Sequence, residues 1–160
     1  MNNIVYKPIG VIRSPFKSIS GIPVQPAEAK EQEGIIEVYE EFADGLKDIE
    51  GFSHIIVIYH FHKITQWKHH VIPFMDTQTH GIFATRAPAR ANPVGISILA
   101  LSKRENNLLF VKEVDMLNET PVLDIKPFFG PYDNRFEVKS GWIDNATKTP
   151  DNIVSDERFK

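Results

Sequence analysis

The densest group of polar side chains capable of chemistry lies in residues 81–95, where Arg86, Arg90 and Asn92 lie among prolines and glycines. Proline restricts the backbone, so a loop of this kind holds its polar groups in place before a ligand arrives and loses less entropy on binding. Arginine suits carboxylate and phosphate ligands because its planar guanidinium donates two parallel hydrogen bonds. The segment therefore indicates an anion-binding loop, with an ordinary polar loop as the alternative.

A second candidate pair, Asp124 and Lys126, lies in residues 120–127. Residues two apart in an extended segment point to the same face, where each charge influences the protonation of the other. Such a pair can orient a nucleophile and accept its proton, so both residues are catalytic candidates. A surface ion pair of little energetic consequence is the alternative.

Three histidines, His54, His60 and His62, have the same parity in an apolar segment and are expected to face one side of a strand. His60 and His62 have the spacing of a two-histidine metal site, but Lys63 follows them and no carboxylate comes soon after. We therefore predict that no metal is bound. His62 and Lys63 are instead candidates for ligand contact, with a packing or hydrogen-bonding role as the alternative.

The sequence lacks the motifs of several common catalytic sites. It has no GxGxxG, so the dinucleotide or methyl-donor crevice of a doubly wound sheet is not indicated. It also has no P-loop, no GxSxG and no HExxH. The absence of cysteine excludes disulfides, zinc–thiolate sites and cysteine nucleophiles.

The sequence predicts that mainly β-strands position these residues. Short apolar or β-branched runs separated by turn residues are typical of an antiparallel sheet or barrel, and we expect an all-β fold. In residues 55–61 the hydrophobicity is continuous, which predicts a strand covered on both faces. The expected strands are residues 9–12, 34–38, 55–61, 81–84, 95–102, 107–114 and 122–125.

Few segments show helical periodicity, and the clearest is residues 40–49, where Phe42, Leu46 and Ile49 fall at spacings of four and three. This spacing places them on one side of a short helix. Between two later apolar runs, the Asn106-Asn107 pair predicts a hairpin, because asparagine tolerates the positive φ that tight hairpins require.

The formal charge of −3 hides an uneven distribution. Residues 28–50 carry nine acidic side chains but only Lys30 and Lys47. The rest of the chain is therefore net basic, which permits an RNA-facing surface, whereas the acidic run itself reads as a solvated face.

The 160 residues, 42% of them hydrophobic, have the composition of one domain. We expect a single β-barrel domain over residues 1–143 and a polar, loosely ordered tail over residues 144–160. The first ten residues lack the basic and apolar regions of a signal peptide, and no apolar run approaches the ~20 residues of a membrane span. We therefore expect a cytoplasmic protein that does not associate with a membrane.

Taken in chain order, these clusters resemble the TrmO (YaeB-like) family of tRNA threonylcarbamoyladenosine methyltransferases. The resemblance covers most of the chain from Pro8 to about Gly130, and its strongest parts are the FATR string with its following R, NP and G, and the string TPVLDIKP. The resembling segments are residues 8–16, 22–26, 51–54, 61–62, 81–95 and 120–127.

The resemblance implies a non-Rossmann, antiparallel β-barrel with one or two short helices, and a homodimer that holds S-adenosyl-L-methionine near the subunit boundary. It implies methylation of the exocyclic nitrogen of threonylcarbamoyladenosine in the tRNA anticodon loop. The positions that match the family's contacts to its methyl donor are Gln25, Pro26, Ala27, His62, Lys63, Arg86 and Ile96. Asp124 and Lys126 fall in the family's DIKP motif, and Arg90, Asn92 and Arg13 are expected to contact the RNA.

Two departures from the family pattern concern RNA contacts. Val24 stands where many relatives have arginine, and residues 89–92 read Ala-Arg-Ala-Asn where a bulky residue followed by Arg-Pro-Asn is more usual. Two other readings stay open: a non-catalytic β-barrel that binds RNA through a basic, aromatic surface, and a metal-dependent cupin-like enzyme built on His60 and His62.

Overall fold

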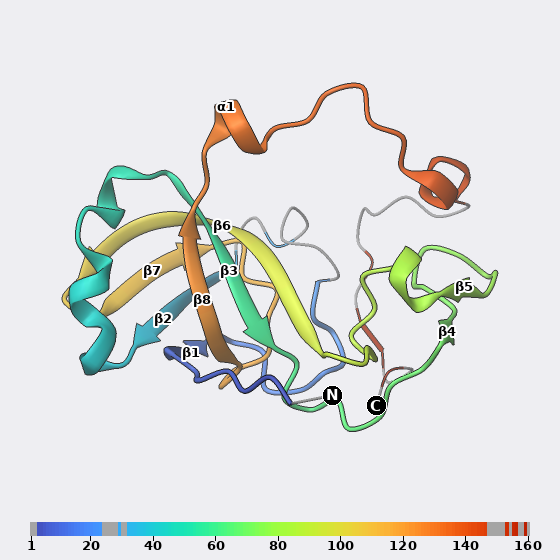
Figure 1. Ribbon diagram of the computed structural model, residues 1–160, viewed down its shortest axis with the longest axis horizontal. Helices are drawn as coiled ribbons and strands as arrows, with labels where there is room; N and C mark the ends of the chain where they lie inside the picture. The colour runs from blue at the N-terminus through green and yellow to red at the C-terminus, as the bar shows by residue number, and fades with distance from the viewer. Residues whose placement is uncertain are drawn as a thin grey trace.

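The computed structural model describes residues 3–23, 29, 32–146, 153, 155, 156 and 159, and its main body is a closed antiparallel β-barrel (Figure 1). This confirms the all-β, non-Rossmann fold expected from the sequence. Each barrel strand within the described residues pairs with two neighbours. The strands follow one another around the barrel as β1 (Gly10–Arg13), β2 (Glu33–Val38), β7 (Leu108–Lys112), β6 (Val94–Glu105), β3 (His54–His60) and β8 (Pro121–Pro127).

The barrel core is filled by alternate residues of each strand, as a period of two requires. In β3, Ile55 and Val57 are fully buried, and β6 presents Leu99 to the same interior. The alternate residues of β3, Ile56 and Ile58, point outward and remain partly exposed. The prediction that this strand is covered on both faces is therefore wrong for the single chain, because only its inner face is packed.

The predicted hairpin is present between β6 and β7. Asn106 adopts the left-handed conformation with φ of 54°, which asparagine tolerates better than most residues. The side chain of Asn107 donates a hydrogen bond of 2.7 Å to the carbonyl of Val38 on β2. The turn thus also connects the hairpin to the next strand of the barrel.

The predicted helix over residues 40–49 forms as two 3-10 turns, η2 (Glu40–Leu46) and η3 (Ile49–Gly51). Asp48 separates them with φ of 69°, a left-handed conformation that ends the helical path. Leu46 and Ile49 are nonetheless buried against the barrel core, as their spacing predicts.

Residues 61–93 leave the barrel between β3 and β6 and form a small lobe beside it (Figure 1). The lobe contains the two-stranded sheet of β4 (His70–Val71) and β5 (His80–Gly81), followed by η4 (Ile82–Ala84). The strand expected over residues 81–84 is therefore wrong beyond its first residue. The lobe has its own apolar cluster, made of the buried side chains Val71, Ile82, Ala87, Ala89 and Phe159.

An arm of residues 128–146 runs from the end of β8 across to the lobe (Figure 1). It contains α1 (Gly130–Asp133) and η5 (Gly141–Asn145). At the lobe, the Trp142 indole stacks on His80 with ring centroids 4.5 Å apart and donates a 2.8 Å hydrogen bond to the carbonyl of Ala84. The arm therefore links the barrel to the lobe.

The described residues of the C-terminal tail contact the rest of the chain. The Ser155 carbonyl accepts a hydrogen bond of 2.9 Å from the backbone N–H of Gly21, and Phe159 packs edge-to-face on Phe74 with ring centroids 5.2 Å apart. Within the described ranges, no helix is long and apolar enough to cross a membrane.

Candidate functional site

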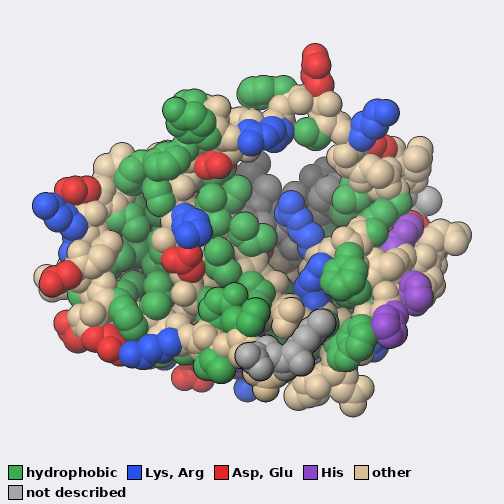
Figure 2. Space-filling model, viewed as in Figure 1, with side chains coloured by type: hydrophobic (Ala, Val, Ile, Leu, Met, Phe, Trp, Pro, Cys, Tyr) green, Lys and Arg blue, Asp and Glu red, His purple; other side chains and the backbone are tan. Residues whose placement is uncertain are grey.

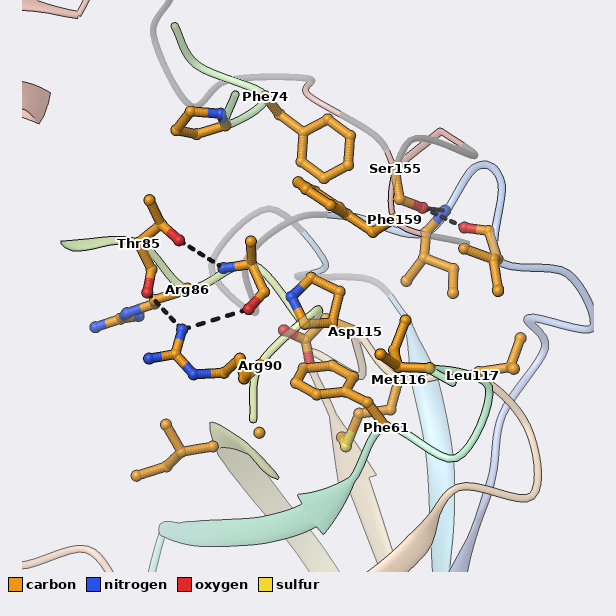
Figure 3. Close-up of a pocket in the computed structure, with 18 of the residues that line it drawn as sticks. Phe61, Phe74, Thr85, Arg86, Arg90, Asp115, Met116, Leu117, Ser155 and Phe159 are labelled. Atoms are coloured by element: carbon orange, nitrogen blue, oxygen red, sulfur yellow. Dashed lines mark hydrogen bonds between the residues drawn. The ribbon is translucent and has the colours of Figure 1, made fainter. Parts of the chain in front are cut away.

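A cavity of about 810 Å³ lies where the barrel meets the lobe. Its barrel wall comes from the end of β3 and the start of β6, and its lobe wall comes from residues 83–88. Figure 3 shows Arg86 and Arg90 on one side of this space and the rings of Phe74 and Phe159 on another. The wall is mostly apolar with a few polar groups, which is the usual character of a small-molecule site.

Five residues predicted from the sequence line this cavity: His62, Lys63, Arg86, Arg90 and Ile96. They come from separate segments, and the fold brings them together at the end of the barrel. His62 and Lys63 directly follow β3, whereas Ile96 lies near the start of β6. The structure thus brings His62 and Arg86 together at one cavity, while their ligand contacts stay predictions.

Gln25, Pro26 and Ala27 lie outside the described residues. Ile22 and Pro23, which precede them in the chain, line the cavity.

Asp124 and Lys126 do not line the cavity, so the structure does not bring them together with His62 and Arg86 there. Both project from the outer face of β8, where Lys126 Nζ lies 2.7 Å from Asp124 Oδ2. Asp124 is opposite Ile58, which is in turn opposite Ile96 at the cavity wall. With strands about 4.8 Å apart, Asp124 lies about 10 Å from Ile96 across the outer face.

Two other predicted substrate residues, Arg13 and Asn92, also lie away from the cavity wall. The Arg13 guanidinium is 2.9 Å from Glu37, which the pairing of β1 with β2 places beside it, and 3.7 Å from Glu119 in the segment before β8. Asn92 is exposed in the turn before β6, where its carbonyl accepts a hydrogen bond from Val94. Neither residue is placed beside the other candidates.

Arg90 shapes the lobe wall through its own hydrogen bonds. Its Nη1 lies 2.8 Å from the carbonyl oxygen of Thr85, 3.2 Å from that of Ile82 and 3.3 Å from that of Ala87 (Figure 3). Thr85 Oγ1 also donates to the Ile82 carbonyl. This arrangement satisfies backbone groups that no strand pairs, so Arg90 fixes the loop from which Arg86 extends. The predicted RNA contact of Arg90 stays a prediction.

The sequence reasoning missed a group of polar residues at the barrel end, in which Ser97 and Tyr59 are buried and Asp115 is partly buried. Ser97 Oγ donates a 2.7 Å hydrogen bond to Asp115 Oδ1 and lies 3.3 Å from the hydroxyl of Tyr59. Tyr59 and Asp115 both line the cavity. Burial raises the pKa of the Asp115 carboxyl to about 7, against the opposing effects of Ser97 and of the positive charge of Arg86. Burial, and then the charge of Asp115, raise the pKa of Tyr59.

Gly95 makes room for the Tyr59 ring. The two residues are direct partners across β3 and β6, and a Cβ on Gly95 would lie 2.4 Å from ring atoms of Tyr59. No real side chain tolerates such a distance. The glycine therefore lets the ring lie against β6, where Phe61 packs on it edge-to-face at 5.2 Å.

His62 lines the cavity just beyond the end of β3. Burial lowers its pKa from the usual histidine value, and the charges of Lys63 and His60 lower it further. Its Nδ1 lies 3.5 Å from Thr120 Oγ1. His54 and His60 share the outer face of β3, but His62 lies beyond the strand end, so the single face expected for all three is wrong. Within the described ranges, no three His, Asp or Glu side chains gather as metal ligands.

The comparisons with known proteins agree with the resemblance found in the sequence. Residues 11–134 match the model of the tRNA-methyltransferase O N-terminal domain, TrmO. The chain is 49% identical to a "probable S-adenosyl-L-methionine-binding protein" of Pyrococcus abyssi over 98% of this chain and 85% of that one. It is 33% identical to the tRNA (adenine(37)-N6)-methyltransferase of Escherichia coli, over 80% of this chain and 59% of that enzyme.

The fold is shared with a solved structure. The crystal structure of TrmO from Pseudomonas aeruginosa superposes with a TM-score of 0.74 at 32% identity, covering 88% of this chain. The chain spans 62% of that TrmO chain. The match covers most of the barrel and the lobe together. The chain therefore belongs to the TrmO family, an enzyme family whose named members include S-adenosylmethionine-binding proteins and tRNA methyltransferases.

Proposed function

We propose that this protein transfers a methyl group from S-adenosylmethionine to the exocyclic nitrogen of threonylcarbamoyladenosine in the anticodon loop of cytoplasmic tRNA. The observation that carries the proposal is the cavity of about 810 Å³ in which His62, Lys63, Arg86 and Ile96 meet. All four correspond to donor-contacting positions in the resemblance to the family. The cavity volume falls in the range of cofactor sites, and the names of the relatives support the same activity.

The residues of the cavity fit the chemical groups of the donor. Arg86 offers a planar guanidinium to a carboxylate, and Asp115 offers an anion to an ammonium or a sulfonium. Phe61 and Phe74 provide aromatic surface for a flat purine. The carboxylate, the cationic groups and the purine of the donor thus each find a partner in the cavity wall.

When bound, the donor supplies an activated methyl group, whose bond to sulfur breaks as a bond to the substrate nitrogen forms. The task of the chain is then to align the two reactants, and alignment can lower a barrier by several kcal/mol, within the ~7–11 attributed to proximity. The bonds of Arg90 to the lobe backbone and the packing of Tyr59 on Gly95 keep both cavity walls fixed. Such preorganisation reduces the ordering that binding requires.

Asp124 is the proposed acceptor of the proton that the substrate nitrogen loses, and Lys126 holds its carboxylate in place. Asp124 lies on the outer face, about 10 Å from the cavity wall at Ile96, so a nucleotide larger than the cavity can reach both. The carbamoyl N–H is a weak nucleophile, and a positioned carboxylate assists its attack as the carbon–nitrogen bond forms. The carboxylate releases the proton to water when the product leaves.

The proposed assembly is a homodimer formed through the outer face of the barrel. Figure 2 shows hydrophobic side chains gathered over β3, β6 and β8 on this face. Ile96 is 57% exposed and Ile98 is 40% exposed, and their partners Ile58 and Ile56 extend the same patch. Contiguous exposed apolar surface indicates an interface, and a second copy explains why both faces of β3 are hydrophobic.

The dimer is tested by Ile98→Glu, which places a charge in the centre of this face. We expect the wild-type chain to have the mass of a dimer in light scattering and the variant to have the mass of a monomer, because an unpaired charge disfavours an apolar interface. Circular dichroism checks that the variant remains folded. A wild-type chain that is monomeric at micromolar concentration contradicts the dimer.

The activity is tested by incubating the full chain with methyl-labelled S-adenosylmethionine and with tRNA that carries or lacks the threonylcarbamoyl group. We expect label in the first tRNA and not in the second. Asp124→Asn should reduce turnover at least tenfold with donor affinity unchanged, whereas equal loss of donor affinity would reassign Asp124 to binding. A chain that binds tRNA but gives no heat with the donor in calorimetry is a non-catalytic RNA-binding barrel instead.

A further inference from the structure

Four consecutive exposed residues, Trp67, Lys68, His69 and His70, follow the cavity residue Lys63 and lead into β4. The Trp67 side chain is 51% exposed, and its ring lies edge-on to that of His69 with centroids 4.3 Å apart. The His69 and His70 rings are 6.5 Å apart. Together they form an aromatic surface on the lobe, and Figure 2 shows histidine side chains gathered there.

This aromatic surface is held rigidly although its rings are not part of the core. The backbone N–H of Lys68 donates to the Ala89 carbonyl at 3.0 Å, and the N–H of Ile82 donates to the His69 carbonyl at 2.9 Å. Val71 next to it is buried in the apolar cluster of the lobe. A rigid backbone that presents large rings to solvent is not explained by packing, since packing would bury those rings.

The charge around the surface favours a polyanion. The lobe, residues 61–93, contains four cationic side chains and one carboxylate, Asp76. The cations are Lys63, Lys68, Arg86 and Arg90. Asp76 Oδ2 lies 2.8 Å from His80 Nε2, and this hydrogen bond lowers the pKa of the Asp76 carboxyl. A basic, aromatic surface is the combination by which proteins bind unpaired nucleic-acid strands.

A second hollow on the lobe lies beside these rings. It has a volume of about 360 Å³ and is lined by Lys68, His70 and Thr79, among others. The short segment from Lys63 to His70 therefore contributes to both walls, with Lys63 at the cavity and Lys68 and His70 at this hollow. A strand whose target base enters the cavity would have its neighbouring bases over the aromatic surface.

We propose that Trp67, His69 and His70 form a stacking surface for unpaired bases of the RNA substrate, with Lys68 contacting a phosphate beside them. The inference rests on the proposed function, because it assigns to the lobe the bases that flank the methylated nucleotide. Base–aromatic stacking tolerates any sequence, since every base has a flat face. Lys68 adds a contact to the backbone that carries no sequence information.

The test measures the affinity of the full chain for an RNA anticodon stem–loop in Trp67→Ala and Trp67→Phe. We expect Trp67→Ala to weaken RNA binding about tenfold or more, and Trp67→Phe to retain affinity within about threefold, because phenylalanine keeps a stacking ring. The matched control is Tyr39→Ala, which removes a 41% exposed aromatic beside Glu40 on the opposite, acidic part of the molecule. Affinity for S-adenosylmethionine, measured by calorimetry, should be unchanged in all three variants.

The outcomes separate this inference from the proposed function. If the wild-type chain binds the stem–loop and Trp67→Ala binds equally well, the stacking surface is overturned while the methyltransferase proposal stands. If Trp67→Ala loses donor affinity too, the residue supports the cavity and the stacking role is also wrong. If RNA binding depends on Trp67 but no methyl group is transferred, the stacking surface stands and the proposed function fails.

Discussion

The two ends of the molecule carry opposite charge on different scaffolds. Residues 33–50, from β2 to η3, bear seven carboxylates and the single cation Lys47, and acidic side chains lie along this margin of the barrel in Figure 2. The lobe bears four cations and one engaged carboxylate, Asp76. The net charge of −3 is therefore an average over a surface that repels a polyanion at one end and attracts it at the other.

The two ends also differ in what holds them together. The barrel strands are closed by continuous backbone pairing around a buried core. In the lobe, the sheet consists of two pairs of residues, and much of the backbone is fixed by side chains such as Arg90. Stability thus resides mainly in the barrel, and binding groups are placed on the segment that the barrel supports.

The largest expected effect comes from comparing Arg86→Ala in the lobe with Arg13→Ala on the barrel. We expect Arg86→Ala to reduce the kcat/KM of methyl transfer about a hundredfold, because its guanidinium lines the cavity. Arg13 is engaged by Glu37 and Glu119, so its loss should change kcat/KM less than threefold. Thermal denaturation should show both variants folded, and an unfolded Arg86→Ala would contradict the binding role.

Gly95→Ala tests whether the junction between barrel and lobe depends on the position of Tyr59. The added methyl group would lie 2.4 Å from the ring, so the ring, which lines the cavity, must move. We expect a loss of about 1–3 kcal/mol in the free energy of unfolding, measured with denaturant, and about tenfold weaker donor binding. Unchanged donor affinity in a destabilised variant would show that the ring does not shape the cavity.

Asp115→Asn tests the charge of the carboxylate between the two ends. Because burial raises its pKa to about 7, donor affinity should rise as the pH increases through 7 and the anion forms, and this rise should be absent in the variant. At pH 8 we expect about tenfold weaker donor binding than in the wild type, by calorimetry. An identical pH profile in both proteins contradicts an ionic contact to the donor.

The Asp115 carboxyl should also make the stability of the folded chain depend on pH. A folded-state pKa of about 7 lies above the unfolded value of 3.8, so between these values the folded chain binds more protons and stability falls as the pH rises. Asp115→Asn removes this dependence. Relative to the wild type, we expect the variant to gain on the order of 4 kcal/mol between pH 4 and pH 8, measured by denaturant unfolding.

The smallest expected effect comes from single lysines at the two ends. Lys68→Ala should weaken tRNA binding a fewfold and reduce the slope of log affinity against log salt by about 1, because one phosphate contact is lost. Lys47→Ala, in the acidic end, should leave that slope unchanged. Equal effects of the two substitutions would mean that RNA binding does not distinguish the ends.

The barrel could be predicted from the sequence because its pattern is local. Alternation along β6 places Gly95, Ser97 and Leu99 inside, and the strand follows from those residues alone. The strand predicted over residues 81–84 was wrong because neighbouring apolar residues there have different environments. Ile82 is buried in the lobe, whereas Phe83 is 81% exposed. That difference depends on contacts with distant segments, which a short window of sequence does not contain.

The site was only partly predictable for the same reason. Arg86 and His62 were found because they lie in strings that resemble the family, and the lobe geometry then placed them together. Asp115 carries only a weak local signal, as a single acid between the fully buried Val114 and Met116. Its partner Ser97 is eighteen residues away, and the pairing follows only from how β6 and the segment after β7 lie in the barrel.

The barrel and the lobe have separate apolar clusters, and among the residues that the structure describes no side chain belongs to both. A mutation that alters a buried residue of the lobe, such as Ala89, therefore leaves the larger cluster intact. Over evolutionary time, changes that alter which nucleotide is accepted can accumulate in the lobe without threatening the folding of the rest. This independence gives the molecule a way to acquire new specificity in small, tolerated steps.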